Sequence, residues 1–381
     1  LATISILSTM LLVTLVGTIN IYVGGQDYIT TLHPKDYNVS VVLPTSTDQT
    51  EALLDKVQQV AQETGLKKPS YTTYLYQSAF IMKLAGNDMT VPMQSELDSD
   101  PSILTKSAGT ITVINRQDYE KMTGKKIDLA DDETLVYGKN VSLNKDQPLR
   151  VNGKDWKIKQ ILPSNFTHGE IPNPNDVAME QGIYMVVNDS KEVGLNVAHY
   201  YYIGVASETK GSKKFVEQVQ LALRDTLDQE QAQDGSYAMA SDRHSTEKSY
   251  QELTGTLLFI GVFLSVIFLL GAVLVIYYKQ ISEGYEDRDG FIILQKVGLD
   301  EKQTRSTIRK QILTVFFLPL IFAFLHIAAV FHMLRLIVAL LGVTNLPLLI
   351  QTTLATCGVF LLTYILVFLL TSRSYRKIVA R

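Results

Sequence analysis

Four long apolar runs constrain what this chain can fold into more than any other feature of its sequence. A helix needs roughly 20 consecutive apolar residues to cross the hydrocarbon core of a bilayer. The runs at 1–23, 254–278, 312–332 and 346–370 each reach that length without an Asp, Glu, Lys or Arg. The sequence therefore predicts a polytopic α-helical membrane protein with four transmembrane helices.

Lys and Arg are distributed unevenly over the segments that join these runs, and short cytoplasmic segments are the ones enriched in them. The segment 279–311 holds seven and the tail 371–381 holds four, whereas 333–345 holds only Arg335. We therefore expect a cytoplasmic coupling segment at 279–311, a cytoplasmic basic tail at 371–381 and a short outer loop at 333–345. The segment 24–250, with 31 Asp and Glu against 23 Lys and Arg, then lies on the extracytoplasmic side.

This outer segment reads as an α+β domain inserted between helices 1 and 2. A strand-helix-strand pattern occurs near each of its ends, beginning at "NVSVVL" and at "HYYYIGVA", which suggests two related halves. Two strands are predicted at 38–43 and 71–84, and "SYAMAS" is predicted to close the domain as a strand. The side chains expected on the buried faces of the two helices are Leu53, Val57, Val60 and Ala61, and Phe215, Val219, Ala222 and Leu223.

Turn-forming residues divide the middle of the domain. Asn152 and Gly153 supply the positive φ angles of a tight hairpin, and Gly124 ends a short helix that follows the strand in "GTITVIN". From Asp242 the pattern is helical, without a Pro, as far as the second apolar run. Residues 251–278 are therefore the end of a stalk together with transmembrane helix 2, and such a helix can carry motion between the outer domain and the membrane.

The sequence holds no motif that indicates catalysis. We find no phosphate-binding loop, dinucleotide fingerprint or serine-hydrolase elbow, and no metal-ligand spacing among the His residues and the single Cys357. We expect a non-enzymatic chain that binds no cofactor or metal, with His168 and Glu170 in a solvated turn. His326 and His332 lie near the outer half of the third helix, and the absence of acidic residues from the spans argues against an ion-coupled carrier.

The coupling segment has the pattern of two short helices. Gly298 is expected to end the first, and Asp300 can cap the second. The first has an acidic start followed by apolar residues at a spacing of three, which favours docking into a soluble partner over the alternative of lying on the membrane surface. The candidate docking residues are Glu283, Tyr285, Glu286, Asp287, Arg288, Phe291, Leu294, Val297 and Gly298.

The stretch from about Ser249 to His326 resembles the FtsX/MacB-like permeases of ABC transporters, of the Gram-positive type that exports bacitracin and other antimicrobial peptides. The resemblance is most specific in the segments "YYKQISEGYEDR" and "QKVG". The layout of one helix, a large outer domain and three more helices matches over the whole chain. Gly290 and Ile292 depart from the charged residues that these permeases tend to carry. The opening "LATISILSTM" lacks an initial Met and resembles the helix that opens the second module in longer permeases of this group. The resemblance therefore implies the C-terminal module of a longer permease.

The resemblance implies a permease subunit that couples a separate ATPase to a conformational change of the outer domain, in antimicrobial-peptide export, resistance or sensing. ATP and Mg²⁺ would bind to a cytoplasmic ABC ATPase, expected as a homodimer, and not to this chain. A second permease module or subunit, a sensor histidine kinase and membrane lipid are further expected partners, and nucleic acid is not. The alternative is a regulator without transported substrate that acts on an envelope protein such as a cell-wall hydrolase or a sensor kinase. The expected location is the bacterial cell membrane, since a single Cys allows no disulfide within the chain.

Overall fold

The chain folds into two compact units, which are described separately below. The helical unit comprises Leu1–Gly25 and Tyr250–Arg381, and the α+β unit comprises Gln26–Ser249. The computed structural model describes residues 2–43, 50–93, 96, 99, 107–167, 169–172, 179, 181–195, 197–231, 236–296, 301–343 and 345–379.

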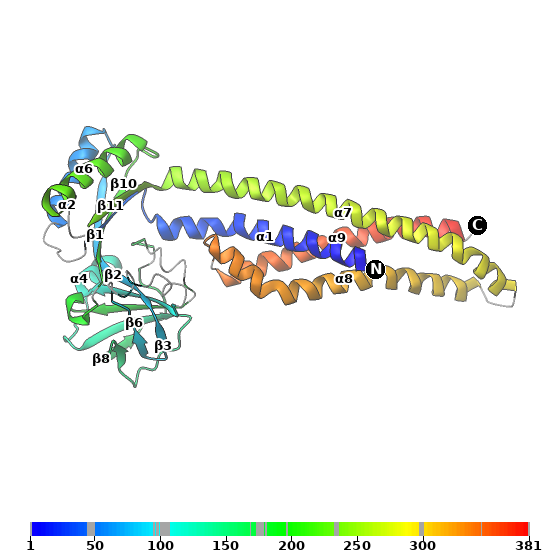
Figure 1. Cartoon of the computed structure of the whole chain (residues 1–381), viewed down its shortest axis with the longest axis horizontal. Coiled ribbons are helices and arrows are strands. Elements are labelled where there is room, and N and C mark those ends of the chain that lie inside the picture. Colours follow the sequence, from blue (N-terminus) through cyan, green and yellow to red (C-terminus); the bar gives the residue numbers. More distant parts are fainter. Residues whose placement is uncertain are drawn as a thin grey trace. The chain divides into compact units, whose positions relative to one another are not determined.

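Four helices in the described part of the chain are long and apolar enough to cross a membrane. They are α1 (Ala2–Leu32), α7 (Arg243–Lys296), α8 (Glu301–Leu340) and α9 (Leu346–Val379). Within the helical unit, Figure 1 shows the start of α1, the end of α7, the start of α8 and the end of α9 toward one end of the bundle. The connection between α8 and α9 lies toward the other end, so successive helices alternate in direction.

Two of these helices extend past the apolar runs that predict them. Helix α1 continues to Leu32, and its last turn is closed by the amide of His33, which donates to the carbonyl of Ile29 at 2.8 Å. It stops there because Pro34 follows, and the residue before a proline is biased away from helical backbone. Helix α8 continues to Leu340, so most of the segment 333–345 is helical and not the outer loop expected from sequence.

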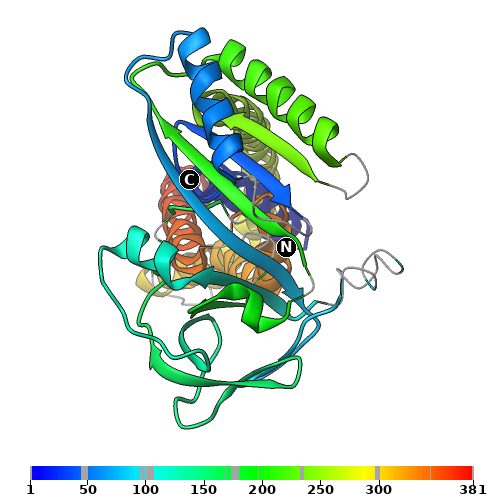
Figure 2. The ribbon, with the colours of Figure 1, turned by 90° about the vertical axis from the view of Figure 1, so that its left-hand side faces the viewer.

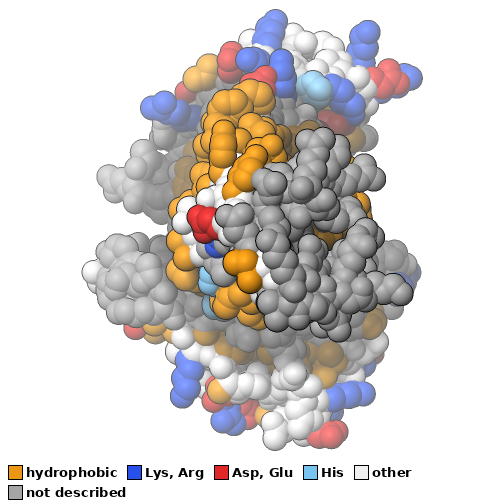
Figure 3. Space-filling model, turned by 90° about the vertical axis from the view of Figure 1, so that its right-hand side faces the viewer, with side chains coloured by type: hydrophobic (Ala, Val, Ile, Leu, Met, Phe, Trp, Pro, Cys, Tyr) orange, Lys and Arg blue, Asp and Glu red, His pale blue; other side chains and the backbone are white. Residues whose placement is uncertain are grey.

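Helix α1 is the central helix of this unit. Its buried Ile4, Leu11 and Leu12 pack in one cluster with residues of the other three helices, and its Val16 and Ile21 pack in a second cluster with α8 and α9. The outward side chains of α7, α8 and α9 are mostly apolar, and the described side chains of the bundle are predominantly hydrophobic in Figure 3. An apolar exterior over helices of this length is what a bilayer requires.

The α+β unit is built on one mixed sheet. The described strands follow the order β11-β1-β10-β2-β5-β9-β6-β8-β7-β4-β3. Their bounds are β1 (Tyr37–Leu43), β2 (Ser70–Ile81), β3 (Lys83–Ala85), β4 (Asp88–Thr90), β5 (Gly109–Asn115), β6 (Glu133–Lys139), β7 (Leu149–Val151), β8 (Lys154–Ile161), β9 (Gly182–Val187), β10 (His199–Ala206) and β11 (Tyr237–Asp242). The helices of the unit are α2 (Thr50–Glu63), α4 (Arg116–Thr123), α6 (Lys213–Gln231) and the short 3-10 helix η2 (Ser190–Val193).

Four strands and two helices form a split β-α-β arrangement. The units β1-α2-β2 and β10-α6-β11 interleave in the order β11-β1-β10-β2, with every neighbouring pair antiparallel. Figure 2 shows α2 and α6 side by side over these strands. Leu53, Val57, Phe215, Val219 and Leu223 are fully or nearly fully buried under them, so the two helix faces predicted from sequence are confirmed. Each such side chain contributes about 1.5–3 kcal/mol of burial free energy.

The segment between β2 and β10 extends the same sheet. The predicted hairpin is confirmed: β7 pairs antiparallel with β8, and Asn152 and Gly153 have φ of 48° and 82°. Strand β6 was not predicted, although it lies between β9 and β8 near the middle of this half. The predicted long strand at 71–84 ends at Ile81, and the chain then forms the separate short pair of β3 with β4.

Candidate functional site

Helices α1 and α7 meet the sheet on neighbouring strands. The chain passes from α1 into β1 and from β11 into α7, and β1 pairs with β11 so that Tyr37 lies opposite Asp242. We call the residues around these two junctions, 30–38, 169–170, 207–212 and 241–246, the root. All of them belong to the α+β unit.

Asp242 fixes the start of α7. Its side chain is 5% exposed, and its two carboxylate oxygens accept hydrogen bonds from the backbone amides of His244 (3.2 Å) and Ser245 (2.8 Å). These amides would otherwise lack partners at a helix N-terminus, and an Asp at this position also favours the positive end of the helix dipole. The amide of Arg243 donates to the carbonyl of Asp36 at 2.9 Å. The first turn of α7 is therefore tied to both junctions.

His33 connects the end of α1 to strand β11. Its Nδ1 shares a hydrogen bond of 3.0 Å with the hydroxyl of Ser241. Burial lowers the pKa of His33, the nearby Arg243 lowers it further, and Asp242 raises it. The imidazole is therefore held in its neutral form, in which one ring nitrogen can accept a hydrogen bond.

Lys35 and Glu170 extend the root toward the segment between β2 and β10. Their side chains form an ion pair at 2.9 Å and are 24% and 29% exposed. The Tyr74 hydroxyl donates to the same carboxylate at 3.3 Å, and burial followed by the charge of Glu170 raises the pKa of Tyr74 to about 12. Glu170 lies in a turn, as expected. It is paired with Lys35 and only 29% exposed, so the expectation that it is solvated is wrong. His168 lies outside the described residues.

Asn38 completes the connection from α1 to the sheet face. Its amide nitrogen donates to the Lys35 carbonyl at 2.9 Å, and its amide oxygen accepts from the buried Tyr202 hydroxyl at 2.7 Å. Phe166 and Ile171, which flank Glu170, are buried against the same tyrosine-rich face. A displacement of α1 would therefore reach both the central strands and the 163–172 loop.

Polar side chains link α1 to its neighbours inside the helical unit. The buried Asn20 accepts a hydrogen bond from Thr352 of α9, Thr9 shares a 3.0 Å hydrogen bond with Nδ1 of His326 in α8, and Ser265 of α7 donates to the carbonyl of Leu11 at 3.4 Å. Hydrogen bonds between helices in lipid contribute about 0.6 kcal/mol each on average. His326 therefore has a structural partner within the bundle.

Small residues allow α1 and α7 to approach closely. A Cβ on Gly261 would collide with Thr18, and a Cβ on Gly271 would meet the side chain of Leu7 at 3.7 Å. Toward the end of α1 and the start of α7, a Cβ on Gly25 would collide with Tyr250, whose hydroxyl donates to the Leu341 carbonyl at 3.1 Å. Contacts of this kind are the usual basis of helix packing in membranes.

The predicted docking residues lie at the opposite end of α7. The helix includes 283–294, and of the nine candidates the structure describes the side chains of two: Tyr285 is 60% exposed, and Glu286 is exposed and accepts a 3.4 Å hydrogen bond from the Ser282 hydroxyl. Ile293, which was not a candidate, is 61% exposed. The side chains of Glu283, Asp287, Arg288, Phe291 and Leu294, and the whole of Val297, Gly298 and Asp300, lie outside the described residues.

The root was missed from sequence apart from Asp242, which was recognised as the start of a helix. Pro34 was an available signal for the end of α1, but nothing in the sequence pairs Lys35 with Glu170 across 135 positions. Among the residues that the structure describes, no group of three or more His, Cys, Asp or Glu could hold a metal ion. The hydrogen bonds and the ion pair at the root anchor the end of α1 and the start of α7 to the sheet.

Four apolar helices and a separate α+β unit define the class of this protein: it is a membrane protein. Residues 262–380 match the family model of the FtsX-like permease C-terminal domain. This part of the chain is therefore an FtsX-like permease domain, of the kind found in ABC transporter permeases. Such permeases normally work with an ATPase and are generally not catalytic themselves.

Two curated proteins of Bacillus subtilis (strain 168) are similar to parts of the chain. The ABC transporter permease protein YxdM is 31% identical over 75 residues, which are 20% of this chain and 12% of that protein. The bacitracin export permease protein BceB is 24% identical over 185 residues, 49% of this chain and 26% of that protein. The matches therefore span well under two thirds of either relative.

One solved structure aligns with part of this chain. A 1.5 Å crystal structure of a Bacillus anthracis protein described as a lipoprotein aligns with 49% of this chain and 92% of its own, at 10% identity and a TM-score of 0.24. A likeness at this level carries no argument about the fold or the function of this chain.

Proposed function

We propose that this chain is the permease subunit of an ABC transporter and transmits the work of a separate ATPase to its α+β unit. The ATPase, with its ATP and Mg²⁺, would dock on the cytoplasmic coupling segment at 279–311. The α+β unit would lie outside the bacterial cell membrane and change conformation in response. The process served would be export of, or resistance to, bacitracin-like antimicrobial peptides, as the name of the relative BceB, a bacitracin export permease protein, suggests.

The observation that carries this proposal is the length of α7. It is one helix of 54 residues from Arg243 to Lys296, which at 1.5 Å per residue is about 80 Å long. The hydrocarbon core of a bilayer is about 30 Å thick. A helix of this length that crosses the membrane must extend well beyond it, and a stiff rod with one end in the root is suited to carrying displacement.

The distribution of basic residues supports the proposed orientation. Lys and Arg are concentrated at 279–311 and 371–381, the segments that follow α7 and end α9, and such residues favour the cytoplasmic side. The alternation of helix direction brings the start of α1 toward the same side. The connection between α8 and α9, together with the sheet junctions of α1 and α7, would then lie outside.

The response of ATP hydrolysis to ligands separates this proposal from the regulator alternative. The full chain would be purified with its co-purifying ATPase in lipid vesicles, and hydrolysis would be measured with and without bacitracin. We expect bacitracin to change the rate several-fold. A rate that bacitracin leaves unchanged, and that changes only when a cell-wall hydrolase or sensor kinase is added, would show the regulator. Hydrolysis by the permease alone would overturn both.

A further inference from the structure

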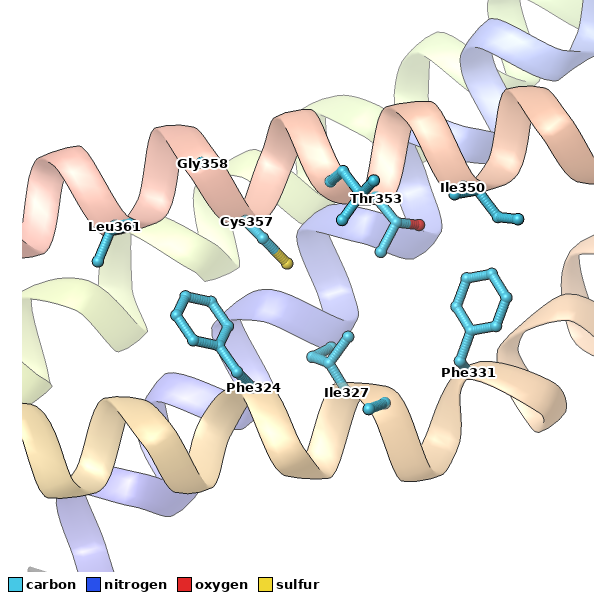
Figure 4. A pocket seen from close by; sticks show the side chains of 10 residues that line it. Phe324, Ile327, Phe331, Ile350, Thr353, Cys357, Gly358 and Leu361 are labelled. Carbon is cyan, nitrogen blue, oxygen red and sulfur yellow. The ribbon is translucent and has the colours of Figure 1, made fainter.

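An open apolar groove lies between α8 and α9 in the helical unit. Its volume is about 590 Å³. In Figure 4, Phe324, Ile327 and Phe331 of α8 point across it toward Thr353 and Cys357 of α9. These positions recur every three or four residues along each helix, so they form one facing stripe on α8 and one on α9.

Contacts between the two helices close the groove at each end. On one side, the rings of Phe317 and Phe368 meet with centroids 5.5 Å apart. On the other side, Leu334 and Leu349 are buried in a common cluster. The space between these contacts is therefore bounded along the helices and open sideways.

Among the residues that line the groove, only Thr353 and Cys357 carry a polar side-chain group, and the thiol of Cys357 is a weak hydrogen-bonding group. The hydroxyl of Thr353 donates to the carbonyl of Leu349 at 2.7 Å, which satisfies it within its own helix. Gly358 keeps one wall open, because a Cβ built there meets no atom within 4 Å. An occupant would thus be recognised by shape and dispersion contacts and not by hydrogen bonds.

The position of the groove along the helices limits what can fill it. The residues that line the groove, and the residues whose contacts bound it, all lie within the apolar spans Phe317–Ala339 and Leu346–Leu369, at the depth of the lipid tails. Protein interiors and their surroundings are close-packed, so a groove at this depth is filled by hydrocarbon, either from lipid or from another helix.

Its size favours a lipid chain over a helix. One turn of α-helix 10 Å across and 5.4 Å long occupies roughly 400 Å³, so the groove accommodates little more than one turn. A spanning helix has more than five turns and could only lay single side chains into the opening. A flexible alkyl chain can enter sideways from the bilayer and follow the groove along its length.

We propose that this groove binds one acyl chain of a bilayer lipid. The chain would lie between α8 and α9 and keep them apart, so that these two helices could approach only when the chain leaves. The inference depends on the membrane location of the chain and not on the proposed transport function. The competing occupant is a helix, either from a second copy of this protein or from the second permease module or subunit expected from sequence.

Photo-labelling tests the proposal. The full chain would be reconstituted in vesicles of phosphatidylcholine and phosphatidylglycerol with a small fraction of phosphatidylcholine that carries a diazirine midway along one acyl chain. After illumination, labelled peptides are identified by mass spectrometry. We expect several-fold more label on the α8 and α9 peptides that line the groove than on the α7 peptide with Phe259 and Phe263, which are 71% and 58% exposed.

Side chains that fill the groove should abolish the excess of photo-label on the α8 and α9 peptides. Gly358→Phe places a ring in the open space, and Ala328→Phe does so from the facing helix; either should reduce groove labelling to the α7 level. Leu362→Phe is the matched control, because Leu362 is 69% exposed on α9 and does not line the groove; its labelling should match wild type. Labelling that is uniform in wild type, or unchanged in both filled variants, would overturn the proposal.

The single cysteine tests the competing occupant. Cys357 is the only Cys in the chain and lines the groove, so an oxidant can join two copies only through this position. We expect no disulfide-linked dimer after oxidation in the same vesicles. A dimer that forms rapidly in wild type and is lost in Cys357→Ser would place a second copy over the groove and refute a lipid chain there.

Discussion

The two ends of α7 differ in what holds them. At Arg243 the helix starts from a buried Asp242 cap, beside a histidine and an ion pair that belong to the same fold. Toward Lys296 the described side chains of Tyr285 and Ile293 are 60% and 61% exposed. One end is thus fixed by the chain's own α+β unit, and the other presents aromatic and apolar surface. A helix that receives displacement from a partner and delivers it to its own domain needs both.

The largest expected effect comes from changing the exposed end. Phe291→Asp, or Glu286→Lys together with Asp287→Lys, should reduce co-purification of the ATPase by at least about tenfold, since removing one partner of an interfacial contact commonly costs 2 kcal/mol or more. Glu252→Lys is the control, because it reverses a charge on the same helix far from the docking residues. If the docking variants retain the ATPase fully, this end of α7 does not bind it, and the proposed difference between the two ends of the helix is wrong.

A kink in the middle of α7 should leave both ends of the helix intact but stop motion from passing between them. Leu253 is 57% exposed on α7, and Leu253→Pro there would kink the helix at a cost of about 3 kcal/mol. We expect the ATPase to stay bound and active, while the ATP-dependent change in hydrogen exchange of β11 and α6 is lost. Leu253→Ala should behave as wild type. An unchanged exchange response in the proline variant would show that α7 does not transmit motion.

The cap at the anchored end can be weakened by one substitution. Asp242→Ala should lower the stability of the α+β unit by about 1 kcal/mol, the usual loss for a helix cap, and speed hydrogen exchange at the amides of His244 and Ser245. Trp156, the only Trp in the chain and fully buried in this unit, gives a fluorescence signal for its unfolding. Asp242→Asn should keep most of the wild-type stability, because Asn also caps helices. If it does not, the stability depends on the charge of Asp242 and not on the cap.

The smallest expected effect is a pH dependence of the anchored unit. The pKa of His33 is lowered by burial and by Arg243, and the pKa of His199 is lowered by burial and by Lys191. A lowered pKa means that the unfolded chain binds protons more readily, so stability should fall as pH drops below about 6.5. His33→Gln with His199→Gln should flatten Trp156-monitored stability between pH 7 and pH 5. If the stability of this variant falls equally steeply with pH, other titratable groups cause the pH dependence.

The parts of the fold that depend on local patterns were predictable. Apolar spacing located the four long helices and the buried faces of α2 and α6, and Asn152-Gly153 located a hairpin. Strand β6 was missed because "ETLVYGK" has no clear alternation and is paired with β9, about fifty residues away. The extent of α8 was underestimated because the apolar run ends at His332, whereas the helix continues to Leu340. Gly342, whose φ is +85°, follows in the turn after the helix.

The root could not be predicted because its contacts join residues far apart in sequence. Ser241 and His33 are separated by 208 positions and Lys35 and Glu170 by 135, and no periodic pattern encodes such pairs. The docking residues stay a prediction, since most of their side chains lie outside the described residues. Local chemistry therefore indicated where the helices run, while the sheet topology decided which side chains anchor them.

The pairing of β1 with β11 has a consequence for how such proteins can diversify. Because Tyr37 and Asp242 face each other on adjacent strands, the chain enters the sheet from α1 and leaves it toward α7 at points only about 5 Å apart. Any other domain with its termini on paired strands would fit between the same two helices. Recombination could thus exchange the α+β insert while leaving the sequence of the four long helices unchanged.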